Sequence, residues 1–195
     1  MYSTRWSRWS RTDQVFLEGL LWALPGIVLL QVLLRAVRAV RGDALQTVGF
    51  LPEELLAPTA LVPGPLTGTI VIADPTATQY GWSLFPMVLL LVLAGVATRL
   101  LLGIARSLRT GDPFTSANAS RLKWLGILVI VGGTFFPVFE SIAHYGVLDP
   151  LLTDAPGGGQ LRMQLWPFLT GMLLFFLAEV FRRGARLRED VEGLV

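Results

Sequence analysis

Residues 75–98 read PTATQYGWSLFPMVLLLVLAGVAT, a stretch of 24 residues without one charged side chain. Three further stretches of 16 residues share this property: 19–34, 124–139 and 163–178. A helix that crosses the hydrocarbon core of a membrane needs about 20 mostly apolar residues, so these three reach the length only with a charge at one end. The sequence therefore predicts an all-α integral membrane protein, a bundle of four transmembrane helices.

The composition favours the same class. Of 195 residues, 53% are hydrophobic and 15% are charged, and the mean hydropathy is +0.59. Soluble domains carry about 25% charged residues, so this chain could hardly cover a surface in water. The formal net charge is only +2, which argues against direct binding of nucleic acid. The chain has no cysteine, which excludes disulfides, iron–sulfur clusters and thiolate metal sites, and we expect neither a metal nor a cofactor.

The spans divide the chain into inner and outer segments. We expect transmembrane helices at about 15–37, 82–105, 124–146 and 164–181. Outer loops at 38–81 and 147–163, an inner turn and helix at 106–123, and a tail at 182–195 complete the chain. The loop at 38–81 contains five prolines, which forbid a long helix, and two β-rich pieces that can pair as a small sheet, Ala44–Leu51 and Leu66–Ile72.

Proline in the first span predicts one unsatisfied backbone group. Pro25 has no N–H to donate, so the carbonyl of Leu21 loses its partner and the helix should kink. Such kinks are tolerated in membranes when a neighbouring helix supplies the missing bond.

The distribution of Lys and Arg predicts the orientation. Twelve of these residues fall at the N-terminus, between the second and third spans, and at the C-terminus, whereas four fall in the other loops. Because the side richer in Lys and Arg is normally cytoplasmic, we expect both termini in the cytoplasm and the protein in the cell inner membrane. Its first partner is the lipid bilayer.

Three charges fall at similar depth towards the cytoplasmic face: Glu18, Arg99 and Glu179. A charge inside a bilayer is costly unless it is paired, hydrated or able to reach the interface. One interpretation is that Arg99 bridges one or both glutamates, because a guanidinium offers five N–H donors. The alternative is that all three side chains extend into the inner headgroups.

A second group of polar residues is expected near the outer ends of the spans. Glu140 and His144 lie four residues apart on one face of the third span, and Arg35 and Arg38 of the first span reach a comparable depth. The cluster is either a protonation-sensitive or cation-binding site or a polar contact that holds the two helices together.

Two inner segments form recognisable motifs, GDPFTSANASRL at 111–122 and AEVFRRGARLRED at 178–190. Both resemble signatures of the bacterial membrane family filed as domain of unknown function 2975. The residues that carry the resemblance are Gly111, Asp112, Pro113, Phe114, Asn118, Arg121, Arg183, Gly184, Arg188 and Glu189. The resemblance implies no established activity. It also implies a partner, because family members are often encoded beside a small helix-turn-helix regulator.

The sequence contains no Gly-rich phosphate loop, no His-Glu-x-x-His motif and no Gly-x-Ser-x-Gly motif, so we expect no enzyme and no catalytic residue. The leading hypothesis is a membrane protein that senses or sequesters a cytoplasmic partner. The two motifs could form its surface, or they could only lock two helix ends together. The alternative is a small transporter, channel or immunity-type protein that uses the site around Glu140 and His144.

Overall fold

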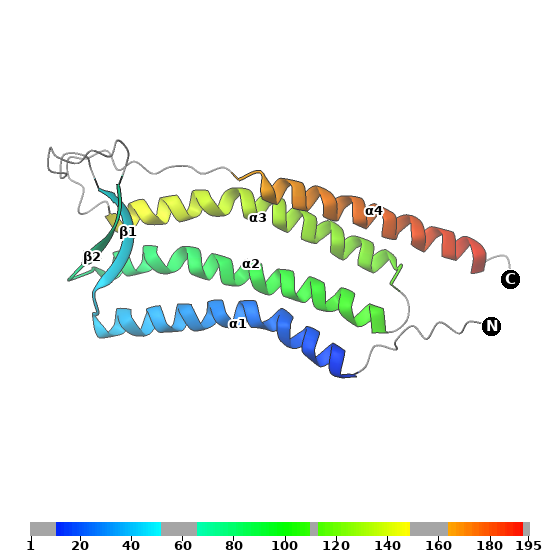
Figure 1. Cartoon of the computed structure of the whole chain (residues 1–195), viewed down its shortest axis with the longest axis horizontal. Coiled ribbons are helices and arrows are strands. Elements are labelled where there is room, and N and C mark those ends of the chain that lie inside the picture. Colours follow the sequence, from blue (N-terminus) through cyan, green and yellow to red (C-terminus); the bar gives the residue numbers. More distant parts are fainter. Residues whose placement is uncertain (1–10, 52–65, 110–112, 149–163, 193–195) are drawn as a thin grey trace. The chain divides into compact units, whose positions relative to one another are not determined.

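The computed structural model describes residues 11–51, 66–109, 113–148 and 164–192. Its elements, in chain order, are helix α1 (Arg11–Arg41), strands β1 (Leu45–Leu51) and β2 (Leu66–Ile72), and helices α2 (Ala77–Arg109), α3 (Ser116–Leu148) and α4 (Trp166–Glu192) (Figure 1). These described residues are mostly helical and form one small sheet.

Within the described ranges, three helices are long and apolar enough to cross a membrane: α1 over Val15–Arg41, α2 over Ala77–Ser107 and α3 over Ser116–Leu148. Helix α4 does not meet the same criteria, because Glu179, Arg182 and Arg183 follow only 13 uncharged residues of the helix. Large apolar side chains are nevertheless exposed on both α1 and α4; Phe16 is 72% exposed and Leu173 is 67% exposed. Exposed apolar surface of this extent is typical of contact with lipid.

The end of α1 is set by Gly42, which has a φ of 69°. The N–H groups of Gly42 and Asp43 donate to the carbonyls of Ala39 and Arg38, over 3.2 and 3.0 Å. This pair of bonds is a Schellman motif, in which a left-handed residue, usually glycine, closes the helix. After this motif the chain continues into β1, which begins at Leu45.

Strands β1 and β2 form an antiparallel pair in which Leu45 lies opposite Ile72 and Leu51 opposite Leu66. The sheet predicted from the β-rich pieces is therefore present, with bounds that differ by one residue. Leu45 and Ile72 are buried together with Tyr80 of α2 and Val147 of α3.

Helix α2 begins five residues before the predicted span because a capping box precedes it. The side chain of Gln79 accepts a hydrogen bond from the N–H of Thr76 over 2.8 Å, and the N–H of Gln79 donates to the hydroxyl of Thr76 over 3.3 Å. These reciprocal bonds satisfy N–H groups that a helix start otherwise leaves unpaired. The side-chain amide nitrogen of Gln79 donates to the carbonyl of Val147 over 2.9 Å.

Helix α1 changes direction in its blue N-terminal half (Figure 1). The carbonyl of Leu21, which Pro25 leaves without a helical donor, accepts a hydrogen bond from the hydroxyl of Thr98 in α2 over 3.1 Å. The predicted supply of the missing bond by a neighbouring helix is thus confirmed.

Helices α3 and α4 approach each other closely at two glycines. A Cβ added to Gly171 would lie 2.9 Å from the carbonyl oxygen of Gly126, and one added to Gly126 would lie 3.1 Å from the carbonyl oxygen of Gly171. Small residues of this kind allow helix backbones to meet in membrane proteins.

The contacts divide the chain into two compact units. One contains the described parts of Met1–Leu29, Leu90–Phe135 and Met163–Val195, and the other those of Leu30–Leu89 and Phe136–Arg162. Every contact discussed below lies within one unit.

Candidate functional site

The first motif starts α3 through a conventional cap. Thr115 is the residue before the helix, and its hydroxyl accepts a hydrogen bond from the N–H of Asn118 over 3.2 Å. Its carbonyl accepts hydrogen bonds from the N–H groups of Asn118 and Ala119. Threonine is favoured at this position because its side-chain oxygen accepts a hydrogen bond from an N–H of the first turn that has no partner within the helix. The turn therefore fixes Asn118 at the third helical position.

The Asn118 side chain is fully buried, and each of its polar atoms has a partner. Its amide nitrogen donates to the hydroxyl of Ser107 in α2 and, over 2.9 Å, to the carbonyl of Pro113. Its oxygen accepts a hydrogen bond of 2.8 Å from Arg121. A buried amide requires this degree of pairing, because each unpaired group would cost stability.

Arg121 extends the same network to α2. The nitrogen that bonds Asn118 also donates to the carbonyl of Gly103 over 3.0 Å. A Cβ on Gly103 would lie 2.6 Å from Nε of Arg121. The guanidinium can therefore lie against α2 only because position 103 has no side chain. We call Gly103, Ser107, Pro113, Asn118 and Arg121 the Asn118 network; it joins the end of α2 to the start of α3.

The two motifs meet at Phe114. The centroid of its ring lies 5.0 Å from the ring centroid of Phe181 in α4, and the two ring planes make an angle of 45°. A Cβ on Gly184 would lie 2.8 Å from Cδ1 of Phe114. Glycine inside a helix costs about 1 kcal/mol relative to alanine, and the position of Phe114 gives a packing reason for it here. We call Phe114, Phe181 and Gly184 the aromatic contact.

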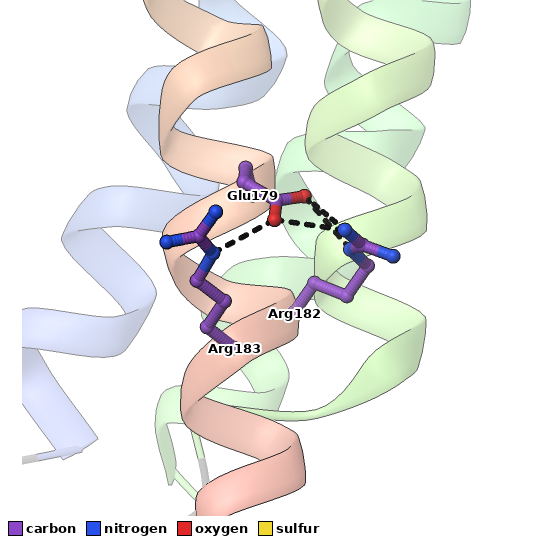
Figure 2. A network of polar contacts seen from close by, with 3 residues as sticks. All are labelled: Glu179, Arg182 and Arg183. Atoms are coloured by element: carbon purple, nitrogen blue, oxygen red, sulfur yellow. Dashed lines mark hydrogen bonds and ion pairs between the residues drawn. The ribbon is translucent and has the colours of Figure 1, made fainter.

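Glu179 pairs within its own helix, as Figure 2 shows. Arg182 donates to both carboxylate oxygens over 2.7 and 2.8 Å, and Arg183 donates over 2.9 Å. Arginines one turn away in the same helix reach the carboxylate with little loss of chain entropy. The bridge from Arg99 to one or both of Glu18 and Glu179 stays a prediction.

The pairing has one electrostatic consequence. The hydrogen bond and charge of the carboxylate raise the pKa of the Arg182 guanidinium. Both arginine side chains remain accessible, at 52% for Arg182 and 76% for Arg183. Arg188 and Glu189 are also exposed on α4, whereas Gly111 and Asp112 lie outside the described residues.

The outer cluster falls in the other unit, around two cavities. Arg35, Glu140 and His144 line one of about 140 Å³, in which His144 shares a hydrogen bond of 3.4 Å with the hydroxyl of Thr47 in β1. Arg35 also lines a larger cavity with Arg38. The structure thus brings Arg35, Glu140 and His144 together, and it places Arg38 on the second cavity.

Sequence reasoning missed several of these positions. Ser107, Gly103 and Thr47 act through residues distant in the chain, and their short polar or missing side chains give no signal of it. Within the part of the chain that the structure describes, no group of His, Cys, Asp and Glu is placed to hold a metal ion.

Comparison with known proteins gives a family match that covers both motifs. A family model described as Protein of unknown function (DUF2975) matches residues 57–195, more than half of the chain, and both motifs fall in this range. The predicted resemblance is confirmed. No curated protein and no solved structure matches the chain.

Proposed function

The chain belongs to the DUF2975 family of proteins of unknown function, and we propose that it is a non-enzymatic inner-membrane protein that binds a protein partner in the cytoplasm. The aromatic contact carries this proposal. It packs Phe114 of the first motif on Phe181 and Gly184 of the second. The contact holds the start of α3 against α4 and so determines how the charged end of α4 is presented.

The proposal uses four membrane crossings with both termini in the cytoplasm. Helix α4 packs against α3 through Gly171 and Gly126, as transmembrane helices often do. The 13 uncharged residues at its start cover about 20 Å. The crossing therefore also uses residues before Trp166 and the long side chains of Arg182 and Arg183, which can extend to the interface. The excess of Lys and Arg in 106–123 and 182–195 orients these segments inwards.

The charged end of α4 is the proposed binding surface. Eleven residues of helix follow Phe181, a length of about 16 Å. Arg182, Arg183, Arg186 and Arg188 are exposed along it, and the apolar side chain of Leu187 is 67% exposed. Guanidinium groups around an exposed apolar residue suit a partner that offers carboxylates around a small apolar patch.

A helix-turn-helix regulator is the partner we propose. Held at the membrane by its acidic surface, such a regulator would be kept from its DNA sites. Release on a signal would then change transcription without any chemical step in the membrane protein, so the proposal needs no catalytic residue.

Site-specific photo-crosslinking in the native cells tests this function. A photoreactive phenylalanine analogue replaces Leu187, and the control carries it at Val40, which is 90% exposed in α1. We expect a crosslinked DNA-binding protein at position 187 and not at position 40. Arg183→Glu should abolish the product, whereas Arg41→Glu should leave it. Crosslinks to lipid alone, or equal products at both positions, would contradict the proposal.

The cavity around Glu140 and His144 favours a second function, a small transporter, channel or immunity-type protein. Proton or ion flux into liposomes that hold the purified protein tests it. Flux that Glu140→Gln abolishes would support the second function, and absence of flux in the unaltered protein would exclude transport.

A further inference from the structure

The larger polar cavity lies where the end of α1 meets the sheet and the start of α2. Its volume is about 540 Å³, within the usual range of about 300–1,000 Å³ for pockets that bind small organic molecules. Among the described residues its lining is mostly polar: Arg35, Arg38, Asp43, Gln46, Thr47 and Tyr80 contribute to it.

Two of these residues bring positive charge to one wall. Arg35 and Arg38 are three residues apart in α1 and so share a helix face. Within the described ranges, neither arginine forms an ion pair. Arg35 donates hydrogen bonds to the carbonyl of Ser83 over 3.3 Å and to the sulfur of Met87 over 3.7 Å. Because a guanidinium has five N–H donors, most of them are left for a ligand. Asp43, the one acid on this cavity among the described residues, balances only one of the two charges.

The remaining lining suits hydroxyl groups. The hydroxyl of Tyr80, which belongs to the lining, donates to the carbonyl of Asp43, so its oxygen can still accept a hydrogen bond. Thr47 and Gln46 from β1 add further donors and acceptors. The cavity therefore combines an anion-binding wall with groups that can bind a polyol.

We propose that this cavity binds a phosphate ester that carries a small hydroxylated group. Arginine matches the geometry of phosphate with parallel hydrogen bonds. The positive charge that Asp43 leaves unbalanced suits a phosphate ester, which carries one negative charge as a diester and up to two as a monoester. The ester comes either from a soluble metabolite or from the headgroup of a phospholipid. This site is independent of the proposed cytoplasmic partner, so either one can fail without the other.

Ligand titration of the full-length protein in an uncharged detergent tests the site. The soluble probe is sn-glycerol 3-phosphate, and the lipid probe is dihexanoyl phosphatidylglycerol below its micelle concentration. Glycerol serves as the uncharged control, and sodium chloride keeps the ionic strength equal throughout. Binding is measured by calorimetry.

The matched variants are Arg38→Gln, which removes a charge from the cavity, and Arg41→Gln, which removes one just outside it. Both arginines are exposed, so either variant should fold; circular dichroism checks this. We expect Arg38→Gln to weaken binding about tenfold, as for the loss of charge-assisted hydrogen bonds, and Arg41→Gln to leave it nearly unchanged.

Each outcome decides the proposal. Binding of glycerol phosphate that depends on Arg38 indicates a soluble ester, and binding of the lipid probe alone with the same dependence indicates a headgroup. The proposal is overturned if neither probe binds. It is also overturned if glycerol binds as well as its phosphate, or if the two variants weaken binding equally.

Discussion

The hydroxyl of Thr98 in α2 donates a hydrogen bond to the carbonyl of Leu21 in α1. Thr98 is only 4% exposed, and it precedes Arg99 in an otherwise apolar stretch. The bond compensates for the donor that Pro25 lacks, so a bend in one helix is coupled to a side chain of the next. A single buried hydroxyl thereby links α1 to α2 at the position of the bend.

Thr98→Val removes the donor and keeps the shape of the side chain. We expect a loss of about 1 kcal/mol in the free energy of unfolding, since hydrogen bonds between helices in a membrane contribute about 0.6 kcal/mol on average and up to about 1.7. Unfolding in mixed detergent micelles measures it.

A second substitution separates this bond from simple packing. In Pro25→Ala, the restored N–H can bond the Leu21 carbonyl within α1, so Thr98→Val should cost clearly less in that background. An equal cost in both backgrounds would show that the hydroxyl does not compensate for Pro25.

Asn118→Ala should destabilise the start of α3 more strongly. It removes the three side-chain bonds to Ser107, Pro113 and Arg121 at once, although the Pro113 carbonyl keeps the N–H of Thr115 and Arg121 keeps the carbonyl of Gly103. We expect a loss of about 2 kcal/mol or more, because each hydrogen bond contributes about 0.5–1.5 kcal/mol net. Hydrogen exchange of the first turn of α3 reports the change locally. Ser120→Ala, at an exposed position of the same turn, is the control and should have little effect.

Much of the fold follows from local chemistry and could be predicted. Long apolar stretches specify helices, the β-rich pieces specify the strand pair, and Pro25 specifies which carbonyl needs a donor. The start of α2 lies five residues before the predicted one, although Thr76 and Gln79 form a capping-box pattern in the sequence. Positions of this kind depend only on neighbours in the chain.

The candidate site could be predicted only in part, because its contacts are tertiary. The motifs indicated that Phe114 and Gly184 belong together without showing that one packs on the other. Arg182 and Arg183 lie one helical turn from Glu179, and Arg99 is expected at a similar depth in another helix. Depth in the membrane alone does not indicate which arginine the carboxylate pairs with. The role of Gly103 depends on where Arg121 passes, which no sequence pattern encodes.

Gly184→Ala should disrupt the aromatic contact. The added methyl group would lie 2.8 Å from Cδ1 of Phe114, so the ring must move away from α4. We expect a net loss of about 1 kcal/mol, because strain of about 1–3 kcal/mol outweighs the gain of about 1 kcal/mol from better helix propensity. Thermal unfolding measures the change.

The same position distinguishes the contact from a general effect of alanine. Phe114→Leu offers a smaller side chain, so it should recover part of the stability in the Gly184→Ala background. Gly19→Ala in α1, where nothing lies within 4 Å of the added Cβ, should be neutral or stabilising. If Gly184→Ala is as well tolerated as Gly19→Ala, the aromatic contact does not constrain α4.

Gly171→Ala tests how closely α4 packs against α3. The new Cβ would lie 2.2 Å from Cγ1 of Ile130 and 2.9 Å from the carbonyl oxygen of Gly126. The isoleucine side chain can change rotamer, but the carbonyl belongs to the backbone of α3, so relief requires the two helices to separate. We expect a loss of about 1–3 kcal/mol, measured by unfolding in mixed micelles.

Ile130→Ala in the same chain should relieve only part of this loss, because the backbone clash persists. Gly95→Ala, with open space around the added Cβ, should cost nothing. A full rescue by Ile130→Ala would mean that side chains, and not the two backbones, determine the separation of α3 and α4.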